Sequence, residues 1–470
     1  MGETRSPGTE PPSRSIVDVD PLTRELGERF RAAGHELYLV GGAVRDRFLR
    51  PEVEPAELDL ATDATPQQTV AALQGWADSR YVQGARFGTV GARKGERVYE
   101  ITTFREEVYP HDERKPVVTF GKDILTDLSR RDFTMNAMAV RLPEGEFLDP
   151  YGGVKALAAR VIDTPLEPDV AFSDDPLRML RAARFASTLG FTPAPRVVEA
   201  MARMRGRLEI VSAERIQVEL NRLLLGGHPT KGLELISETG LADLFLPELP
   251  ALRLEQDPVH KHKDVLHHTF AVVERCEADL VLRLAALLHD IGKPKTRQFT
   301  SEGVQFHHHE VVGARMAEER LRALRYPNHL IDDVTKLIEL HLRFHGYGEG
   351  WTDSAVRRYV RDAGPLLDRL NQLTRADVTT GNLFKARQFR ALQDDLEKRI
   401  ARLAEEENLL ALRPPLDGND IMVHLGIPPG PLVGEAREYL LEQRIERGPI
   451  EEEEAYRLLD TWAAERGLSR

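Results

Sequence analysis

Two glycines and two carboxylates near the N-terminus have the residue types and the spacing of a phosphate-transfer site. Gly41 and Gly42 end the apolar run LYLV and precede a short helical pattern, AVRDRFL. Adjacent glycines let backbone N–H groups approach a phosphate, and the N-terminus of the next helix favours its negative charge. Glu57 and Asp59 lie two positions apart in ELDLAT, so in a strand they face the same side and can share divalent cations. Alone, a Gly-Gly pair is usually a turn and an acid-x-acid pattern a solvated face, but together they predict nucleotidyl transfer with Mg²⁺.

The second half of the chain offers a metal site of another kind. It carries most of the 15 histidines, and a His-Asp doublet closes an apolar helix. In isolation such a doublet is more often a polar pair at a helix end. Imidazoles grouped with carboxylates, however, suit a divalent transition metal such as Ni²⁺, Co²⁺ or Mn²⁺. The predicted ligands are His268, His289, Asp290 and Asp377, with His309 and His341 available for a second ion.

The elements around the first site form a predicted mixed sheet with helices. A helix from Pro21 to Ala33 leads into the strand before Gly41, ELDLATD is the next strand, and TPQQTVAALQGWA is a capped helix. GTVGARKG and RVYEITTFR are predicted to form an antiparallel hairpin that turns at Lys94-Gly95. Its Glu100 is a candidate third carboxylate, and the alternative is a plain cross-strand pair with a base. The segment after Arg105, EEVYPHDERKP, is charged and contains prolines, which predicts a mobile loop.

Before residue 148 the segment RRDFTMNAMAV carries Asp132 and Asn136 among hydrophobic residues, where they need hydrogen-bond partners. From Asp149 to Leu225 the pattern becomes helical. FSDDPLRMLRAARFASTLGF predicts one helix with Ser173 as its N-cap and Gly190 as its end, which places Asp175 and Arg178 on one face. Residues 178–222 contain nine arginines, four glutamates and no aspartate, so a local basic patch is expected.

Length and composition predict a multidomain soluble protein. The 470 residues are 41% hydrophobic and 30% charged, with net charge −12, and no run of about 18 apolar residues appears. No secretory signal appears, and Cys276 is the only cysteine. Both observations favour the cytoplasm, and a single cysteine excludes a disulfide framework. The parts expected along the chain are a disordered leader (1–18), a unit with a mixed sheet (19–148), a helical region (149–250), a histidine-rich helical unit (251–400) and a helical tail (401–470).

The sequence resembles a known family. LYLVGGAVRDRFL, ELDLATDATP, RRDFTMNAMA, LDPYGGVKAL, DDPLRMLRAARFASTLGF and ERIQVEL follow one another as do the motifs of class II tRNA nucleotidyltransferases, the CCA-adding enzymes, and their poly(A) polymerase relatives. The second half resembles the HD phosphohydrolase superfamily, and DGNDIM with PPGPLVG resembles the tail of HD-containing bacterial CCA-adding enzymes. The resemblance implies an α+β fold: a polymerase-β-like head with a mixed sheet and helices, then a mostly α-helical neck, HD body and tail. It also implies that the parts expected along the chain are a leader (1–18), a nucleotidyltransferase head (19–148), a neck that reads the base and binds RNA (149–250), an HD domain (251–400) and a tail (401–470).

The resemblance also implies a role for each matching residue. Glu57 and Asp59 would be catalytic and bind Mg²⁺. The nucleotide-binding residues would be Gly41, Gly42 and Arg45 at the triphosphate, Arg131, Asp132 and Asn136 at sugar and phosphates, and Asp175 and Arg178 at the base, beside Arg181 and Arg184.

The implied function is template-independent addition of CCA to tRNA 3′ ends from CTP and ATP, with no membrane partner, and a second phosphohydrolase activity in the HD domain. The alternatives are a poly(A), A-only or CC-only RNA nucleotidyltransferase, and an HD phosphohydrolase whose decayed head binds RNA. Two positions depart from the family: Glu57 stands where Asp is usual, and Asp174 where Glu is usual. The loop REEVYPHDERKP before the RRD motif resembles that of full CCA adders, although an A-only enzyme would have it too.

Overall fold

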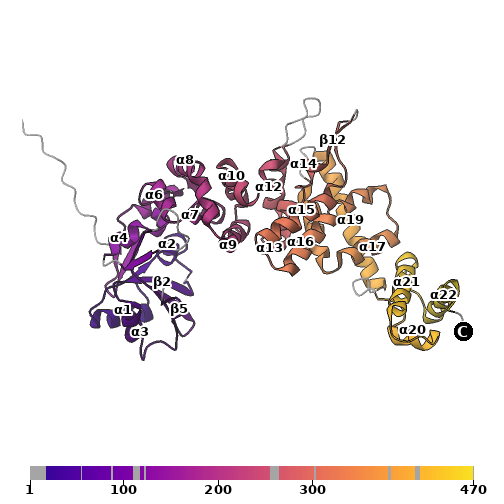
Figure 1. Cartoon of the computed structure of the whole chain (residues 1–470), viewed down its shortest axis with the longest axis horizontal. Helices are drawn as coiled ribbons and strands as arrows, with labels where there is room; N and C mark the ends of the chain where they lie inside the picture. Colours follow the sequence, from indigo (N-terminus) through magenta and orange to yellow (C-terminus); the bar gives the residue numbers. More distant parts are fainter. Residues whose placement is uncertain are drawn as a thin grey trace, which may run out of the picture. The chain divides into compact units, whose positions relative to one another are not determined.

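The computed structural model describes residues 17–53, 55–85, 88–108, 117–120, 123–253, 264–300, 303–378, 383–407 and 413–468. The chain divides into two compact units, Met1–Phe245 and Leu246–Arg470 (Figure 1). This division lies near the boundary predicted after residue 250, and the finer domain boundaries stay predictions. Almost all of the predicted leader lies outside the described residues. Among the helices that the structure describes, none has the length and apolar character needed to cross a membrane.

The first unit contains a seven-stranded mixed sheet in the order β3-β4-β5-β2-β1-β8-β9. β2 and β5 are parallel neighbours, and β4 and β5 form the predicted antiparallel hairpin, with Lys94 opposite Arg97. The strands are β1 (Leu37–Val40), β2 (Glu57–Thr62), β3 (Ser79–Tyr81), β4 (Thr89–Lys94), β5 (Arg97–Thr103), β8 (Ala139–Leu142) and β9 (Glu146–Leu148).

Short helices begin where the sequence supplies a cap or a glycine. Thr65 forms a capping box with Gln68 at the start of α3, as predicted. The helices of the head are α1 (Pro21–Ala32), α2 (Gly42–Leu49), α3 (Pro66–Ala72), α4 (Ile124–Ser129) and α5 (Gly153–Ala159). The predicted loop after Arg105 is partly wrong, because β6 (Arg105–Val108) pairs with β7 (Val117–Phe120), whose residues VVTF favour a strand. Residues 109–116 of that loop lie outside the described residues.

The helical region of the first unit corrects one prediction. Ser173 is not an N-cap, since it lies inside α6 (Pro168–Asp174), and α7 (Leu177–Leu189) begins only after Pro176. The residue before a proline is disfavoured in helical conformation, so the chain is extended at Asp175. Gly190 ends α7 with φ +70°, as predicted. α7 packs against α9 (Ala213–Leu224) and α10 (Pro229–Glu238), while α6 packs against α8 (Pro195–Met204).

The described residues of the second unit are helical apart from one two-stranded ribbon and the connecting segments. α12, α13, α16 and α18 pack against one another, and Cys276 caps the C-terminus of α12, where it is buried. Its elements are α12 (Val265–Arg275), α13 (Leu280–Leu288), α14 (Lys293–Thr296), β12 (Arg297–Thr300), β13 (Gly303–Phe306), α15 (His309–Ala323), α16 (Asn328–Leu340), α17 (Asp353–Ala363), α18 (Leu367–Asp377) and α19 (Leu383–Glu407). The tail helices α20 (Gly418–Leu425), α21 (Pro431–Arg447) and α22 (Glu452–Glu465) share a core that includes Trp462. The α+β class is confirmed.

Candidate functional site

The central strands of the sheet bring three carboxylates together. Glu57 and Asp59 are exposed on one side of β2, whereas the alternate residues Leu58 and Leu60 are buried. Glu100 of β5 stands opposite Asp59 in the parallel register. Although Asp59 is open to solvent, it lies in a concave site, where partial desolvation and the negative charge of Glu57 raise its pKa. Burial, then Glu57 and Asp59, likewise raise the pKa of Glu100. Carboxylates that repel one another in this way are relieved by hard cations, so they fit Mg²⁺.

A glycine places the backbone against this cluster. Gly41 has φ +69°, which glycine adopts at low cost, and it immediately precedes the first residue of α2. A Cβ at Gly41 would lie 3.1 Å from Nη1 of Arg131 and 3.6 Å from a carboxylate oxygen of Asp59. The missing side chain thus lets the backbone, a guanidinium and a candidate metal ligand meet at one point.

A chain of polar contacts joins four predicted nucleotide-binding residues. Arg45 Nη1 donates to Oδ1 of Asn136 at 2.9 Å, and Asn136 Nδ2 donates to Oδ1 of Asp132 at 2.9 Å. The other oxygen of Asp132 lies 2.7 Å from Nη2 of Arg181. Burial alone would raise the pKa of Asp132, but Arg181 and Asn136 lower it, so the carboxylate stays charged. These side chains face a pocket of about 590 Å³ whose lining includes Gly41, Gly42, Arg45, Asp59, Arg131, Asp132, Asn136, Arg181 and Arg184.

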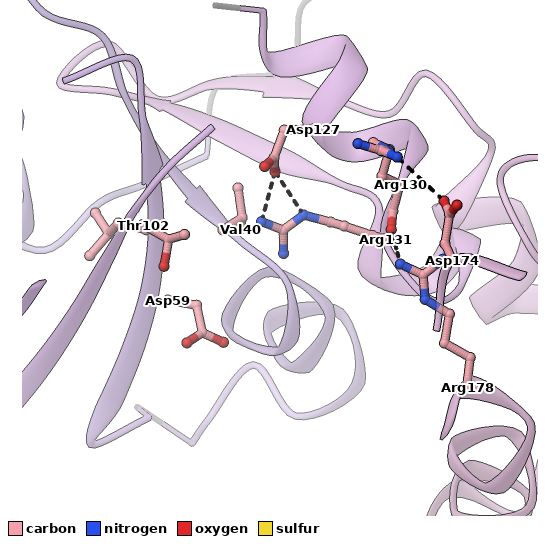
Figure 2. Close-up of a pocket in the computed structure, with 9 residues that line it drawn as sticks. Val40, Asp59, Thr102, Asp127, Arg130, Arg131, Asp174 and Arg178 are labelled. Atoms are coloured by element: carbon pink, nitrogen blue, oxygen red, sulfur yellow. Dashed lines mark hydrogen bonds and ion pairs between the residues drawn. The ribbon is translucent and has the colours of Figure 1, made fainter. Parts of the chain in front are cut away.

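Asp59 and Arg131 also line a second pocket of about 290 Å³, shown in Figure 2. Arg131 Nη2 lies 3.0 Å from Oδ2 of Asp127, and Figure 2 marks this contact. Arg178 donates to the carbonyl oxygen of Ala171 at 3.1 Å and to that of Arg130. Asp127 was not singled out from the sequence, although its i, i+4 spacing from Arg131 is one at which an acid and a base meet along a helix. Asp59 and Arg131 therefore line both polar pockets.

The structure corrects the predicted geometry of Asp175 and Arg178. Asp175 precedes α7 in an extended conformation, so the two residues do not share a helical face. Its carboxylate pairs with Arg215 of α9 at 3.0 Å, and only its backbone oxygen, at 3.0 Å from the amide of Arg178, connects the two. Arg215 belongs to the basic run noted in the sequence, but the sequence gives no sign of this partner.

Arg184 forms a buried ion pair with Glu219. Its Nη1 lies 3.2 Å from an oxygen of Glu219 in α9, and the two side chains are only 9% and 8% exposed. Its guanidinium lies 4.1 Å from the ring centroid of Phe185. Burial lowers the pKa of Arg184 to about 10, so it keeps its charge at neutral pH. The pair fixes one arginine of the larger pocket.

The second unit brings all the predicted HD ligands into one cluster. His268, His289 and Asp377 form one group and Asp290, His309 and His341 another, with the candidate ligand atoms of each group within 4.8 Å of one another. Asp290 joins the groups, because its oxygens lie 3.2 Å from Nε2 of His289 and 3.4 Å from Nε2 of His309.

The histidines are oriented as metal ligands. The Nδ1 atoms of His289, His309 and His341 lie 2.8, 2.8 and 2.6 Å from backbone carbonyl oxygens, to which a protonated Nδ1 donates. This contact turns Nε2 of each ring into the cluster, where it is buried and makes no hydrogen bond of its own. Burial alone would lower the pKa of His289, but the oxygens of Asp290 that lie near Nε2 of His289 and His309 raise it to about 10. Imidazole nitrogens and carboxylates that converge in this way fit a metal ion, which would take the place of the proton on His289. Lys293 lies 2.7 Å from Asp290 and was not identified from the sequence.

Comparisons with known proteins find similar chains over most of the length. Three family models match the chain. The family described as "Poly A polymerase head domain" matches residues 37–163, the one described as "Probable RNA and SrmB- binding site of polymerase A" matches residues 190–252, and the one described as "HD domain" matches residues 265–406. A CCA-adding enzyme of Anoxybacillus flavithermus is 31% identical over 93% of this chain and 94% of its own length. An A-adding tRNA nucleotidyltransferase of Deinococcus radiodurans is 35% identical over 91% of this chain and 95% of its own. The crystal structure of the Bacillus stearothermophilus CCA-adding enzyme in complex with CTP matches with TM-score 0.68 and 26% identity, over 96% of this chain and 99% of that one.

Proposed function

The chain belongs to the family of tRNA nucleotidyltransferases that includes the CCA-adding enzymes, and we propose that it adds CCA to tRNA 3′ ends from CTP and ATP without a nucleic-acid template. The observation that carries the proposal is the placement of Asp59 and Arg131 between two polar pockets, next to Gly41. In the reaction the 3′ oxygen of the RNA bonds to the α-phosphorus, the bond from that phosphorus to the bridging oxygen breaks, and pyrophosphate leaves.

The site offers separate groups for the metal, the triphosphate and the ribose. Mg²⁺ held by Glu57 and Asp59, with Glu100 as a third carboxylate, would activate the attacking hydroxyl and stabilise the leaving pyrophosphate. Arg45, Arg181 and Arg184 offer positive charge to the triphosphate in the larger pocket. Asp132 and Asn136, fixed by Arg181 and Arg45, can hydrogen-bond to the ribose.

Base choice rests on Arg178 and Asp175 in this proposal. A guanidinium donates to acceptors that cytosine and adenine present, and a carboxylate accepts from their exocyclic amino groups, which uracil lacks. In the structure Arg178 donates to two carbonyl oxygens and Asp175 pairs with Arg215. Both residues would exchange these partners for the base.

The test uses purified protein with two tRNAs, one lacking CCA and one ending in CC, and with labelled CTP and ATP supplied separately. CCA addition requires incorporation of CTP on the first tRNA and of ATP on the second. A second candidate, addition of A alone, is favoured by the likeness to the Deinococcus radiodurans enzyme. Incorporation of ATP on the second tRNA, with no CTP incorporated on the first, would select that candidate. A tRNA substrate also supports the cytoplasmic location expected from the sequence.

We also propose that the HD cluster binds Ni²⁺, Co²⁺ or Mn²⁺ and hydrolyses a phosphomonoester or a cyclic phosphodiester. The convergence of the buried Nε2 atoms of His289, His309 and His341 with the carboxylates of Asp290 and Asp377 carries this proposal, because imidazole suits these metals better than Mg²⁺. Hydrolysis would be measured with 4-nitrophenyl phosphate and a 2′,3′-cyclic nucleotide after loading with each metal. No hydrolysis of either ester with any of the three metals would reject the activity.

A further inference from the structure

The two most exposed aromatic side chains that the structure describes both lie in segments next to the HD cluster. Phe299 of β12 is 72% exposed and Phe384 of α19 is 77% exposed. Exposing a phenylalanine to this extent gives up the favourable free energy of burying it, so a function in binding is the natural reason for its retention.

The side chains of β12, in the ribbon formed by β12 and β13, pack little against the core of the unit. Along β12, Gln298, Phe299 and Thr300 are all exposed, so neither face of the strand packs firmly on the rest of the unit (Figure 1). The guanidinium of Arg297 lies 4.5 Å from the ring centroid of Phe299, on the same face of the strand. A two-stranded ribbon is only marginally stable by itself. Because its exposed side chains are not needed for packing, they are available to bind a ligand.

Contacts connect both segments to candidate metal ligands. At the end of β13, the carbonyl oxygen of Phe306 lies 2.8 Å from Nδ1 of His309. In α19, the ring of Phe389 packs on His345 at 6.1 Å, and Nε2 of His345 lies 4.0 Å from Asp377. Because His309 and Asp377 belong to one cluster, the ribbon and the start of α19 both lie beside the HD centre.

The charge of these segments is opposite to that of the whole chain. Residues 293–308 contain Lys293, Lys295 and Arg297 and one acid, Glu302, and residues 383–390 contain Lys385, Arg387 and Arg390 and no acid. Lys293 pairs with Asp290, which leaves both segments with more cations than acids. The whole chain, in contrast, carries a net charge of −12. Exposed aromatic rings among an excess of cations are the combination that binds single-stranded nucleic acid, because bases stack on the rings and phosphates pair with the cations.

We infer that β12, β13 and the first turns of α19 form a surface that binds single-stranded RNA beside the HD centre. A base would stack on Phe299 or Phe384, and the neighbouring cations would bind the phosphates. This surface lies outside the region 190–252 that matches the RNA-binding model, and it does not require the HD centre to be hydrolytic.

The surface is tested by photo-crosslinking of the full chain to an oligouridylate of roughly ten nucleotides that contains 4-thiouridine. Wild-type protein should crosslink in peptides from residues 293–308 or 383–390. Since stacking contributes about 1–3 kcal/mol per base, Phe299→Ala and Phe384→Ala should each lower the yield at their own segment by roughly fivefold or more.

Val423→Ala is the matched control, because Val423 is 79% exposed and lies in the tail helix α20. Its crosslinking should equal that of the wild type. Equal metal content and melting temperature would show that the phenylalanine variants keep the HD centre folded. Crosslinks confined to other segments, or unchanged yields in both phenylalanine variants, would overturn the inference while leaving both proposed enzymatic activities intact.

Discussion

The carboxylate of Asp175 lies 3.0 Å from Nη2 of Arg215, and Arg178 donates instead to backbone oxygens. Each of the two side chains proposed to read the base is therefore held by a neighbour of its own. In the proposed base selection Arg215 would compete with the base for Asp175, and it would then act as a positioning residue.

Replacing Arg178 with Ala should weaken discrimination against UTP by roughly ten- to a hundredfold. The change removes a charged donor, and hydrogen bonds to charged groups contribute about 1.5–3 kcal/mol. Relative kcat/KM for CTP, ATP and UTP measures the loss. Arg203→Ala is the control, since Arg203 forms an exposed pair with Asp169 and lines neither pocket. Unchanged nucleotide preference at an unchanged Tm would refute base reading by Arg178.

Asp59→Asn should abolish incorporation of CTP and ATP while tRNA binding stays near that of the wild type, because the amide is a poor ligand for Mg²⁺. Incorporation on minihelix tRNA and filter binding measure the two properties. Substantial turnover in this variant would contradict the metal assignment. Glu100→Gln tests the third carboxylate in the same assay, and it should lower kcat without changing tRNA affinity.

The raised pKa of Asp59 has a consequence for stability. A carboxyl group whose pKa is higher in the folded state stabilises the fold below its unfolded pKa, and this contribution is lost as pH rises through the folded pKa. In metal-free buffer Asp59→Asn should therefore melt above the wild type at pH 8 and close to it near pH 4. Asp169→Asn should not show this gain, because the hydrogen bond from Arg203 lowers the pKa of Asp169. Equal melting of Asp59→Asn and wild type at pH 8 would contradict the expected repulsion.

Gly41→Ala should raise the KM for both nucleotides and lower kcat. Alanine at φ +69° costs about 1–2 kcal/mol, and its Cβ would lie 3.1 Å from Arg131, forcing that guanidinium to move. Gly75→Ala is a matched control, because Gly75 has φ +75° and open space around its Cβ. If both variants lose stability equally but only Gly41→Ala loses activity, the close approach to Arg131 is responsible. Full activity in Gly41→Ala would exclude this role.

The Arg184 and Glu219 pair should show strong coupling in a double-mutant cycle. Glu219→Leu leaves a buried guanidinium unpaired, a loss of roughly 3–5 kcal/mol, whereas the double variant Arg184→Met with Glu219→Leu should recover most of it. Urea unfolding, followed by a probe in the first unit, measures these differences. Additive effects of the two single changes would show that the ions do not act as a pair.

Asp290→Ala should lose metal from both groups of the HD cluster, since Asp290 lies between them. Elemental analysis after loading with Ni²⁺, Co²⁺ or Mn²⁺ measures bound metal per chain. Asp333→Ala is the control, as it removes a carboxylate from α16 that is not among the predicted ligands. Equal metal in the wild type and Asp290→Ala would leave the cluster only a structural role.

The sequence predicted features that depend on residues a few positions apart, such as the alternation in a strand and the cap of a helix. The alternation in ELDLAT places Glu57 and Asp59 on one side of β2 because side chains alternate in any strand, and Thr65 caps α3 through a contact three residues away. The break at Asp175 was missed because helical spacing was read across a proline.

Partners far apart in sequence could not be read from spacing. Arg215 reaches Asp175 only because α9 packs on α7, and Glu219 meets Arg184 through the same packing. The sharing of Asp59 and Arg131 between two pockets is likewise a product of the folded sheet, not of any local pattern.

The buried position of Cys276 makes the chain convenient for site-directed labelling. Burial raises the pKa of its thiol to about 12, so the thiol stays protonated at neutral pH, and the ionised form is the one that maleimides attack. As the only cysteine, it leaves almost no background reaction in the folded protein. Pairs of cysteines introduced at exposed positions of the two units could therefore carry fluorescent dyes, and energy transfer between them would measure whether the distance between the units changes when tRNA and nucleotide are added.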